Sequence, residues 1–135
     1  MIWKWMEPAI AHVEGGRVDT AVFELAYYTK YKTKLEQAAG SLGWPADKQA
    51  TSFGIYQILG ENLARYSNMT MQDLTAFLMD PTMQYRIAEQ HFYRILNQVI
   101  ERRGSSWPQY VFSCWNAGVN YNEAYSVKVR AFLKV

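Results

Sequence analysis

Few side chains in this sequence could carry out acid–base, nucleophilic or metal chemistry. Its two histidines, His12 and His91, lie far apart along the chain, and Cys114 is the only cysteine. No second histidine follows His12 at the spacing of a zinc protease motif, so we expect neither a metal site nor a cofactor. The Gly-Gly pair at residues 15–16 lacks the Lys-Ser/Thr of a phosphate-binding loop, and no serine nucleophile elbow is present. Carboxylates remain as the candidate catalytic groups.

Glu14 is the carboxylate whose surroundings in the sequence favour chemistry most. It ends an apolar helical pattern made by Ala9, Ile10 and Val13, and the glycines after it leave space around its side chain. A partly desolvated carboxyl group in such a place keeps its proton near neutral pH and can act as a general acid. The alternative is an ordinary solvated glutamate near a helix C-terminus, and position alone favours that alternative.

A second candidate is the stretch QATSFGIYQIL, residues 49–59. Ser52 suits the N-cap of a helix, but Gly54 inside that helix would cost about 1 kcal/mol relative to alanine. A ligand that approaches the backbone closely would explain the glycine. The Gln57 amide, three residues further on, offers a hydrogen-bond donor and an acceptor together. A plain helix start is the competing interpretation.

Hydrophobic periodicity and turn residues indicate a mainly helical chain that positions these groups. Pro8 suits the first turn of a helix that the glycines at residues 15–16 end. Asp19 suits the N-cap of a second segment, whose inward-facing residues would be Val22, Phe23, Leu25 and Ala26. Tyrosine and threonine alternate with lysine over residues 27–34, so a strand is an alternative to a helix there.

The rest of the chain reads as a loop followed by helices. Glycine and proline predict the loop over residues 40–48. Helices are then expected over residues 52–66, 70–79, 80–104, 106–118 and 122–134. The capping box Thr70–Asp73 opens the second of these, and Asp80-Pro81 opens the third. The helix from residue 106 is apolar nearly all round, which predicts that it is buried.

Length, composition and charge narrow the class of protein. The 135 residues, half of them hydrophobic, predict one globular domain over residues 1–135. A net charge of +2 is too small to indicate a nucleic-acid partner. The apolar runs are too short for an integral membrane segment. The N-terminal residues MIWKWMEP lack the apolar core of a secretory signal, so we expect another route of delivery if the protein acts outside the cytoplasm.

Several short segments occur in an order typical of one enzyme family. They are HVEGG, FE at residues 23–24, ATSFGIYQILG, LMDPTMQYRIAEQHFYRIL, WNAG and YSVKV. Together they resemble the lytic transglycosylase domain of the lysozyme-like superfamily, particularly the versions encoded by phages and prophages. The likeness covers about residues 5–133. It implies a mainly α, lysozyme-like single domain, and it allows a small β element in the segment after Glu14.

The resemblance assigns roles to individual residues. It makes Glu14 the catalytic acid and base. The residues that it places at the substrate are Gly54, Ile55, Tyr56, Gln57, Asn116 and, near the catalytic glutamate, Tyr125. Three residues depart from the family pattern: Gly15 replaces a serine, Tyr56 a methionine and Trp115 a tyrosine. Because both must reach one disaccharide at hydrogen-bond range, we expect Glu14 and Gln57 to lie within about 10 Å of each other at a cleft.

The activity implied by the resemblance is cleavage of peptidoglycan glycan strands in the periplasm or cell wall. The partner that delivers such a chain would be a phage virion or a secretion apparatus. A lytic transglycosylase needs one carboxyl group, unlike most glycosidases. A muramidase on the same fold is the first alternative, with Glu24 as the second carboxylate that holds water. A non-catalytic peptidoglycan-binding or virion structural module is the second alternative.

Overall fold

The computed structural model describes all residues from Met1 to Val135. The chain is mainly helical, with eight α-helices, one 3₁₀ helix and a small three-stranded sheet, so the prediction of a mainly α protein is confirmed. Two compact units are present. The first contains Met1–Gly15 and Ala88–Val135, and the second contains Gly16–Ile87.

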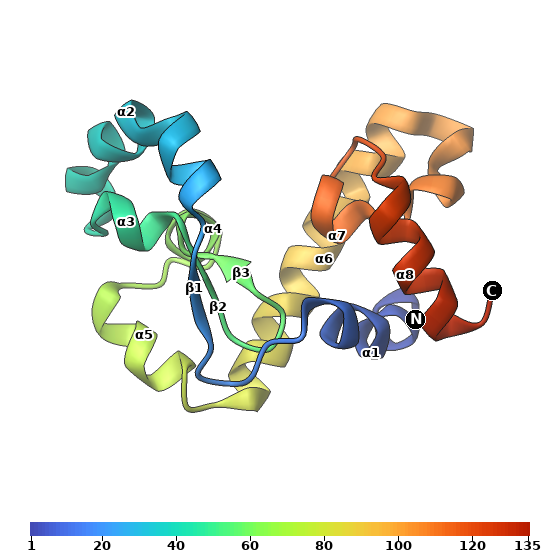
Figure 1. The fold of residues 1–135 in the computed structure, drawn as a ribbon, viewed down its shortest axis with the longest axis horizontal. Coiled ribbons are helices and arrows are strands. Elements are labelled where there is room, and N and C mark those ends of the chain that lie inside the picture. Colours follow the sequence, from blue (N-terminus) through green and yellow to red (C-terminus); the bar gives the residue numbers. More distant parts are fainter. The chain divides into compact units, whose positions relative to one another are not determined.

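The first unit is built entirely from helices. Its elements are α1 (Ile2–Glu14), most of α6 (Pro81–Arg103), the 3₁₀ helix η1 (Gly104–Tyr110), α7 (Cys114–Ala117) and α8 (Glu123–Leu133). Helices α1 and α8 pack against each other (Figure 1). The buried apolar side chains of this unit are Trp3, Met6, Ala9, Ile10, Ala88, Phe92, Leu96, Val99, Val111, Cys114, Tyr125 and Val129.

Helix α1 differs from the prediction at its start and agrees with it at its end. It begins at Ile2, and Pro8 lies inside it. Trp3 and Met6 are fully buried, and their burial outweighs the one hydrogen bond that Pro8 cannot donate. Gly15 ends the helix in the left-handed conformation at φ 67°, and its N–H donates to the Ala11 carbonyl at 3.0 Å.

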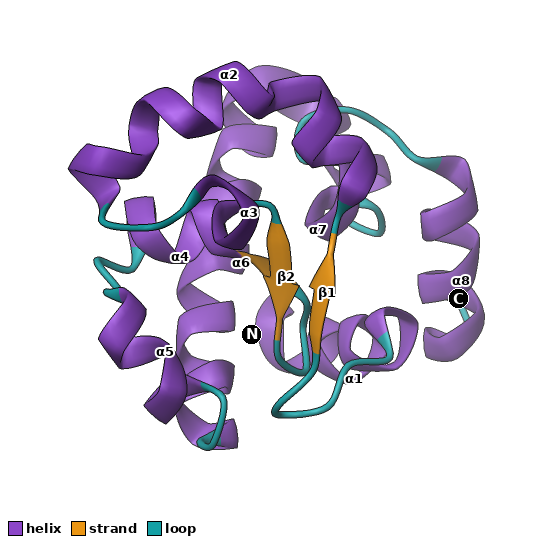
Figure 2. Cartoon of the chain, turned by 60° about the vertical axis from the view of Figure 1, so that its left-hand side comes forward, coloured by secondary structure: helices purple, strands orange, loops and turns teal.

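The second unit combines short helices with the sheet. Its elements are β1 (Ala21–Phe23), α2 (Leu25–Leu42), α3 (Ala46–Gln49), β2 (Thr51–Phe53), β3 (Ile58–Leu59), α4 (Gly60–Tyr66), α5 (Met71–Phe77) and the start of α6. The strands are antiparallel in the order β1-β2-β3, and β1 runs beside β2 in Figure 2. Val22 pairs with Ser52, and Phe53 pairs with Ile58. Strand β1 is the small β element allowed for after Glu14.

The helix predicted over residues 52–66 is wrong in its first half. Thr51–Leu59 is a β-hairpin, and α4 begins only at Gly60, so Ser52 lies in a strand and caps no helix. Two residues of the turn, Gly54 and Gln57, have positive φ angles of 84° and 54°, which an α-helix excludes. The apolar spacing that suggested a helix instead serves a strand that is buried along its whole length.

The segment after Asp19 also differs from the prediction. Asp19 precedes β1 and caps no helix, and the side chains of Val22, Phe23 and Leu25 are 44%, 45% and 66% exposed. The alternating residues 27–34 lie in α2, which is kinked at Tyr31, so the strand alternative is wrong. Tyr27 and Tyr31, one helical turn apart, stack at 4.7 Å, a contact that a strand would separate.

Signals confined to a few neighbouring residues were predicted correctly. Thr70 and Asp73 form a reciprocal capping box at the start of α5. The Asp80 carboxylate accepts from the Met83 N–H at 3.1 Å and opens α6, and α8 begins at Glu123, next to the predicted start at residue 122. The loop predicted over residues 40–48 is shorter, because α2 runs to Leu42 and α3 starts at Ala46. The helix predicted from residue 106 is instead η1, a turn and the four-residue α7.

Candidate active site

Glu14 and Tyr125 are in direct contact within the first unit. The Tyr125 hydroxyl donates to Glu14 Oε2 at 2.6 Å, across 111 residues of sequence. Glu14 is the last residue of α1 and Tyr125 lies in the first turn of α8, so the packing of these two helices brings them together. The distance is typical of a charge-assisted hydrogen bond from a hydroxyl to a carboxylate.

The surroundings of Tyr125 keep it a hydrogen-bond donor. Its side chain is only 8% exposed. Burial raises the pKa of the phenol well above its usual value of 10, and the charge of Glu14 and the hydrogen bond to it raise it further. The donated bond stabilises the carboxylate form of Glu14, whereas the C-terminus of α1 disfavours a negative charge. Opposing influences of this kind suit a group that must both give and take a proton.

Asn116 is connected to Tyr125 through hydrogen bonds made by Asn122. Asn116 is exposed on α7, and its Oδ1 accepts from Asn122 Nδ2 at 2.7 Å. Asn122 in turn accepts from the Tyr125 N–H at 3.1 Å and caps α8. The sequence analysis named Asn116 and Tyr125 but missed Asn122, although an Asn before an acidic first turn is an N-cap signal.

Gly54 and Gln57 meet in the turn of the hairpin, in the second unit. Gln57 Nε2 donates to the Gly54 carbonyl at 2.8 Å, which leaves the acceptor Oε1 for a ligand. Tyr56 is buried at 4% exposure, so its ring belongs to the core more than to an open surface. The glycine has a structural cause that the sequence analysis did not foresee. A Cβ on Gly54 would lie 2.5 Å from the side-chain oxygen of Gln84, and its φ is 84°.

Gln84 is a residue of this region that the sequence analysis missed. It is fully buried on α6, and its amide is hydrogen-bonded to the backbone of three separate segments, at Val18, Ile55 and Phe77. A signal was available, because Gln84 stands one helical turn before Ala88 and therefore on the apolar face of α6. A polar residue on such a face requires hydrogen-bond partners.

Glu24 stands at the N-cap position of α2. Its backbone N–H donates to the Ala50 carbonyl at 2.8 Å, and its half-buried side chain makes no capping hydrogen bond. Glu24 has this position because β1 ends at Phe23 and α2 begins at Leu25, so it is the single residue between them.

His91 and Cys114 are unsuited to proton transfer near neutral pH. Burial, together with the charge of Arg94, lowers the pKa of His91 to about 3, and its ring packs against Trp115 at 5.0 Å. Burial raises the pKa of the Cys114 thiol to about 12. No group of three or more His, Cys, Asp or Glu side chains is placed to hold a metal ion.

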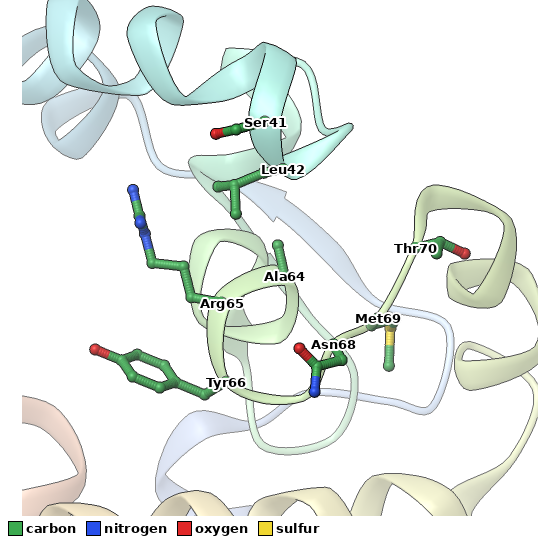
Figure 3. Close-up of a pocket in the computed structure, with 8 residues that line it drawn as sticks. All are labelled: Ser41, Leu42, Ala64, Arg65, Tyr66, Asn68, Met69 and Thr70. Carbon is green, nitrogen blue, oxygen red and sulfur yellow. The ribbon is translucent and has the colours of Figure 1, made fainter.

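Each unit also carries a surface hollow to which none of the predicted site residues contributes. In the second unit, a hollow of about 530 Å³ lies between the end of α2 and the end of α4 (Figure 3). Its lining residues are Ser41, Leu42, Ala64, Arg65, Tyr66, Asn68, Met69 and Thr70. In the first unit, a hollow lies along His12, Val13, Lys128, Ala131 and Phe132, where the imidazole of His12 stacks on Phe132.

The predicted site residues thus fall into two groups. Glu14, Asn116 and Tyr125 belong to the first unit, while Glu24 and the turn residues 54–57 belong to the second. The expected distance between Glu14 and Gln57 therefore stays a prediction. None of the helices has the combination of length and apolar character needed to span a bilayer. Comparison of the chain with protein-family models, with curated proteins and with solved structures gives no match.

Proposed function

We propose that this protein is a peptidoglycan lytic transglycosylase in which Glu14 is the catalytic acid and base. The observation that carries the proposal is the 2.6 Å hydrogen bond from the Tyr125 hydroxyl to the Glu14 carboxyl group. A glutamate at the end of a helix is ordinary, but a buried tyrosine from the other end of the chain directed at it is not. The resemblance of the sequence motifs to that family independently assigns these two residues to one place.

In the first step, Glu14 acts as a general acid. Its carboxyl proton is transferred to the oxygen of the β-1,4 bond between N-acetylmuramic acid and N-acetylglucosamine. The bond from that oxygen to the anomeric carbon breaks, and the acetamido oxygen of the muramic acid stabilises the electron-poor carbon. The Tyr125 hydroxyl then donates to the carboxylate that Glu14 has become, which lowers the cost of the charge.

In the second step, the Glu14 carboxylate acts as a general base. It removes the proton from the C6 hydroxyl of the same muramic acid, and the C6 oxygen bonds to the anomeric carbon. A 1,6-anhydro ring forms, Glu14 regains its proton, and no water is consumed. General acid–base catalysis of this kind contributes about 10²–10⁴-fold to the rate.

The turn at residues 54–57 is the proposed contact for the acetamido and hydroxyl groups of the glycan. Gln57 Oε1 is the acceptor in this turn. The hydrogen bond that Gln57 Nε2 donates to the Gly54 carbonyl holds the amide in one orientation. The substrate places the reaction in the periplasm or cell wall. A phage virion or a secretion apparatus is the proposed means of delivery.

The proposal is tested with the variant Glu14→Gln, which keeps size and hydrogen bonding but removes the transferable proton. We expect clearing of a suspension of purified cell walls to slow by about 10²-fold or more. Glu36→Gln, an exposed glutamate on α2, is the matched control and should retain wild-type activity. Mass spectrometry of the wild-type digest should show anhydromuramic ends, one water lighter than hydrolysis products. Equal activity of Glu14→Gln and wild type would overturn the proposal.

A further inference from the structure

We infer that Gln84 is a positioning residue for glycan binding, which acts through the turn Gly54–Gln57 and does not touch the glycan itself. The inference rests on the proposed function, because it concerns the surface that would hold the sugar. It assigns a role to a buried residue that the reaction steps do not use.

The Gln84 amide is fully used by backbone groups from three places in the second unit. Its Oε1 accepts from the Ile55 N–H at 2.9 Å. Its Nε2 donates to the Val18 carbonyl at 2.6 Å and to the Phe77 carbonyl at 2.8 Å. One side chain therefore ties the hairpin turn to the segment before β1 and to the end of α5.

No other common side chain of this length could make the same three bonds. A glutamate offers only acceptors when ionised, so it would face two carbonyl oxygens without a proton to donate. A methionine has the same reach but would leave the Ile55 N–H and the Val18 carbonyl without the bonds that Gln84 supplies, while the Phe77 carbonyl would keep only its bond from the Asp80 N–H. The chemistry of the site therefore requires the amide, and not merely a side chain that fills the space.

The turn is enclosed so closely that its position depends on Gln84. Gly54 faces the Gln84 amide with no room for a Cβ, and its N–H donates to the Thr20 carbonyl at 2.8 Å. On another side, a Cβ on Gly16 would overlap the Gly54 carbonyl oxygen and approach Gln57 Nε2 to 3.1 Å. Since Gln57 Nε2 is bonded to that same Gly54 carbonyl, any shift of the turn redirects the Gln57 amide.

The test is a double-mutant cycle on the binding of the β-1,4-linked trimer of N-acetylglucosamine, with titration calorimetry as the readout. We expect Gln57→Ala and Gln84→Met each to weaken binding by about 10-fold, the loss of one good hydrogen bond. The double variant should bind no worse than Gln57→Ala alone, because Gln84 acts through Gln57. Gln90→Met, an exposed glutamine on the same helix, is the control and should bind as wild type does.

A purely structural role would give a different result. In that case Gln84→Met would lower the melting temperature while the folded protein kept wild-type affinity, or its loss would add fully to that of Gln57→Ala. If Gln84→Met does not fold, the cycle uses Gln84→Glu, whose affinity should recover at acid pH as protonation restores one donor. If neither variant folds, Gln84 is a core residue and the inference fails. If wild type binds the trimer and the Gln84 variants bind it equally well, this inference alone is overturned. If wild type does not bind the trimer, both this inference and the proposed function are overturned.

Discussion

The hydroxyl of Tyr125 adds one polar atom to a ring that the first unit buries in any case. That atom is directed at Glu14, and the raised pKa of the phenol keeps it protonated at neutral pH. A buried hydroxyl without a partner would destabilise the protein, so Glu14 also satisfies Tyr125. The pair is therefore a structural and a chemical unit at once.

Tyr125→Phe separates these two roles. The variant keeps the ring and loses the donor, and a hydrogen bond to a charged group contributes about 1.5–3 kcal/mol. We expect the rate of wall clearing to fall by about 10-fold or more, since the carboxylate loses its donor in the step that needs it. The melting temperature should fall by several degrees, while the protein stays folded at the assay temperature. Tyr121→Phe, on an exposed tyrosine, is the control. An unchanged rate in Tyr125→Phe would show that the Tyr125 hydroxyl contributes nothing to the reaction.

At the scale of elements, the hairpin of β2 and β3 requires glycine at two positions, for two different reasons. Gly54 has a positive φ and faces Gln84, whereas Gly16 has no special backbone angle and is required only because the turn lies against it. Gly40 in α2 has open space around its Cβ position, so it is the natural contrast.

This contrast gives a prediction for stability. Gly16→Ala should lower the free energy of unfolding by about 1–3 kcal/mol, the usual cost of forcing extra atoms into a packed site. Gly40→Ala should raise it by about 0.5–1 kcal/mol, because alanine is the better helix former and meets no neighbour there. Urea unfolding of the two variants beside wild type measures both values. A Gly16→Ala protein as stable as wild type would show that the turn can move away, against the enclosed geometry.

At the scale of the whole molecule, the proposed transglycosylase and the alternative muramidase differ in the product that each would release. A muramidase needs a second carboxylate to hold water, and Glu24 was the candidate from the sequence. Glu24 stands at the N-cap position of α2, where its backbone N–H donates to the Ala50 carbonyl and its side chain makes no capping hydrogen bond.

Because the proposed transglycosylase reaction needs only the Glu14 carboxyl group, we expect Glu24→Gln to leave the products unchanged. Mass spectrometry of digested sacculi should show anhydromuramic ends from both wild type and this variant, at rates within about twofold of each other, since the residue takes part in neither proton transfer. Borohydride reduction supplies the second measurement, because only hydrolytic products carry a reducible end. Reducing ends that disappear in Glu24→Gln would establish a muramidase and leave Glu14 as its acid.

The sequence by itself determined the features that depend on a few neighbouring residues. The helical class, the stop of α1 at Gly15, the capping box at Thr70 and the start of α6 all follow from local backbone chemistry. The tertiary structure alone decided the features in which contacts with distant segments outweigh the local preference of the chain. Because Trp3 and Met6 are buried, α1 begins before Pro8 instead of at it. Because Thr51–Phe53 pairs with β1, a segment whose apolar pattern suggested a helix forms a hairpin. The Tyr125–Glu14 bond and the three bonds of Gln84 join residues far apart in the chain, so no periodicity in the sequence could display them.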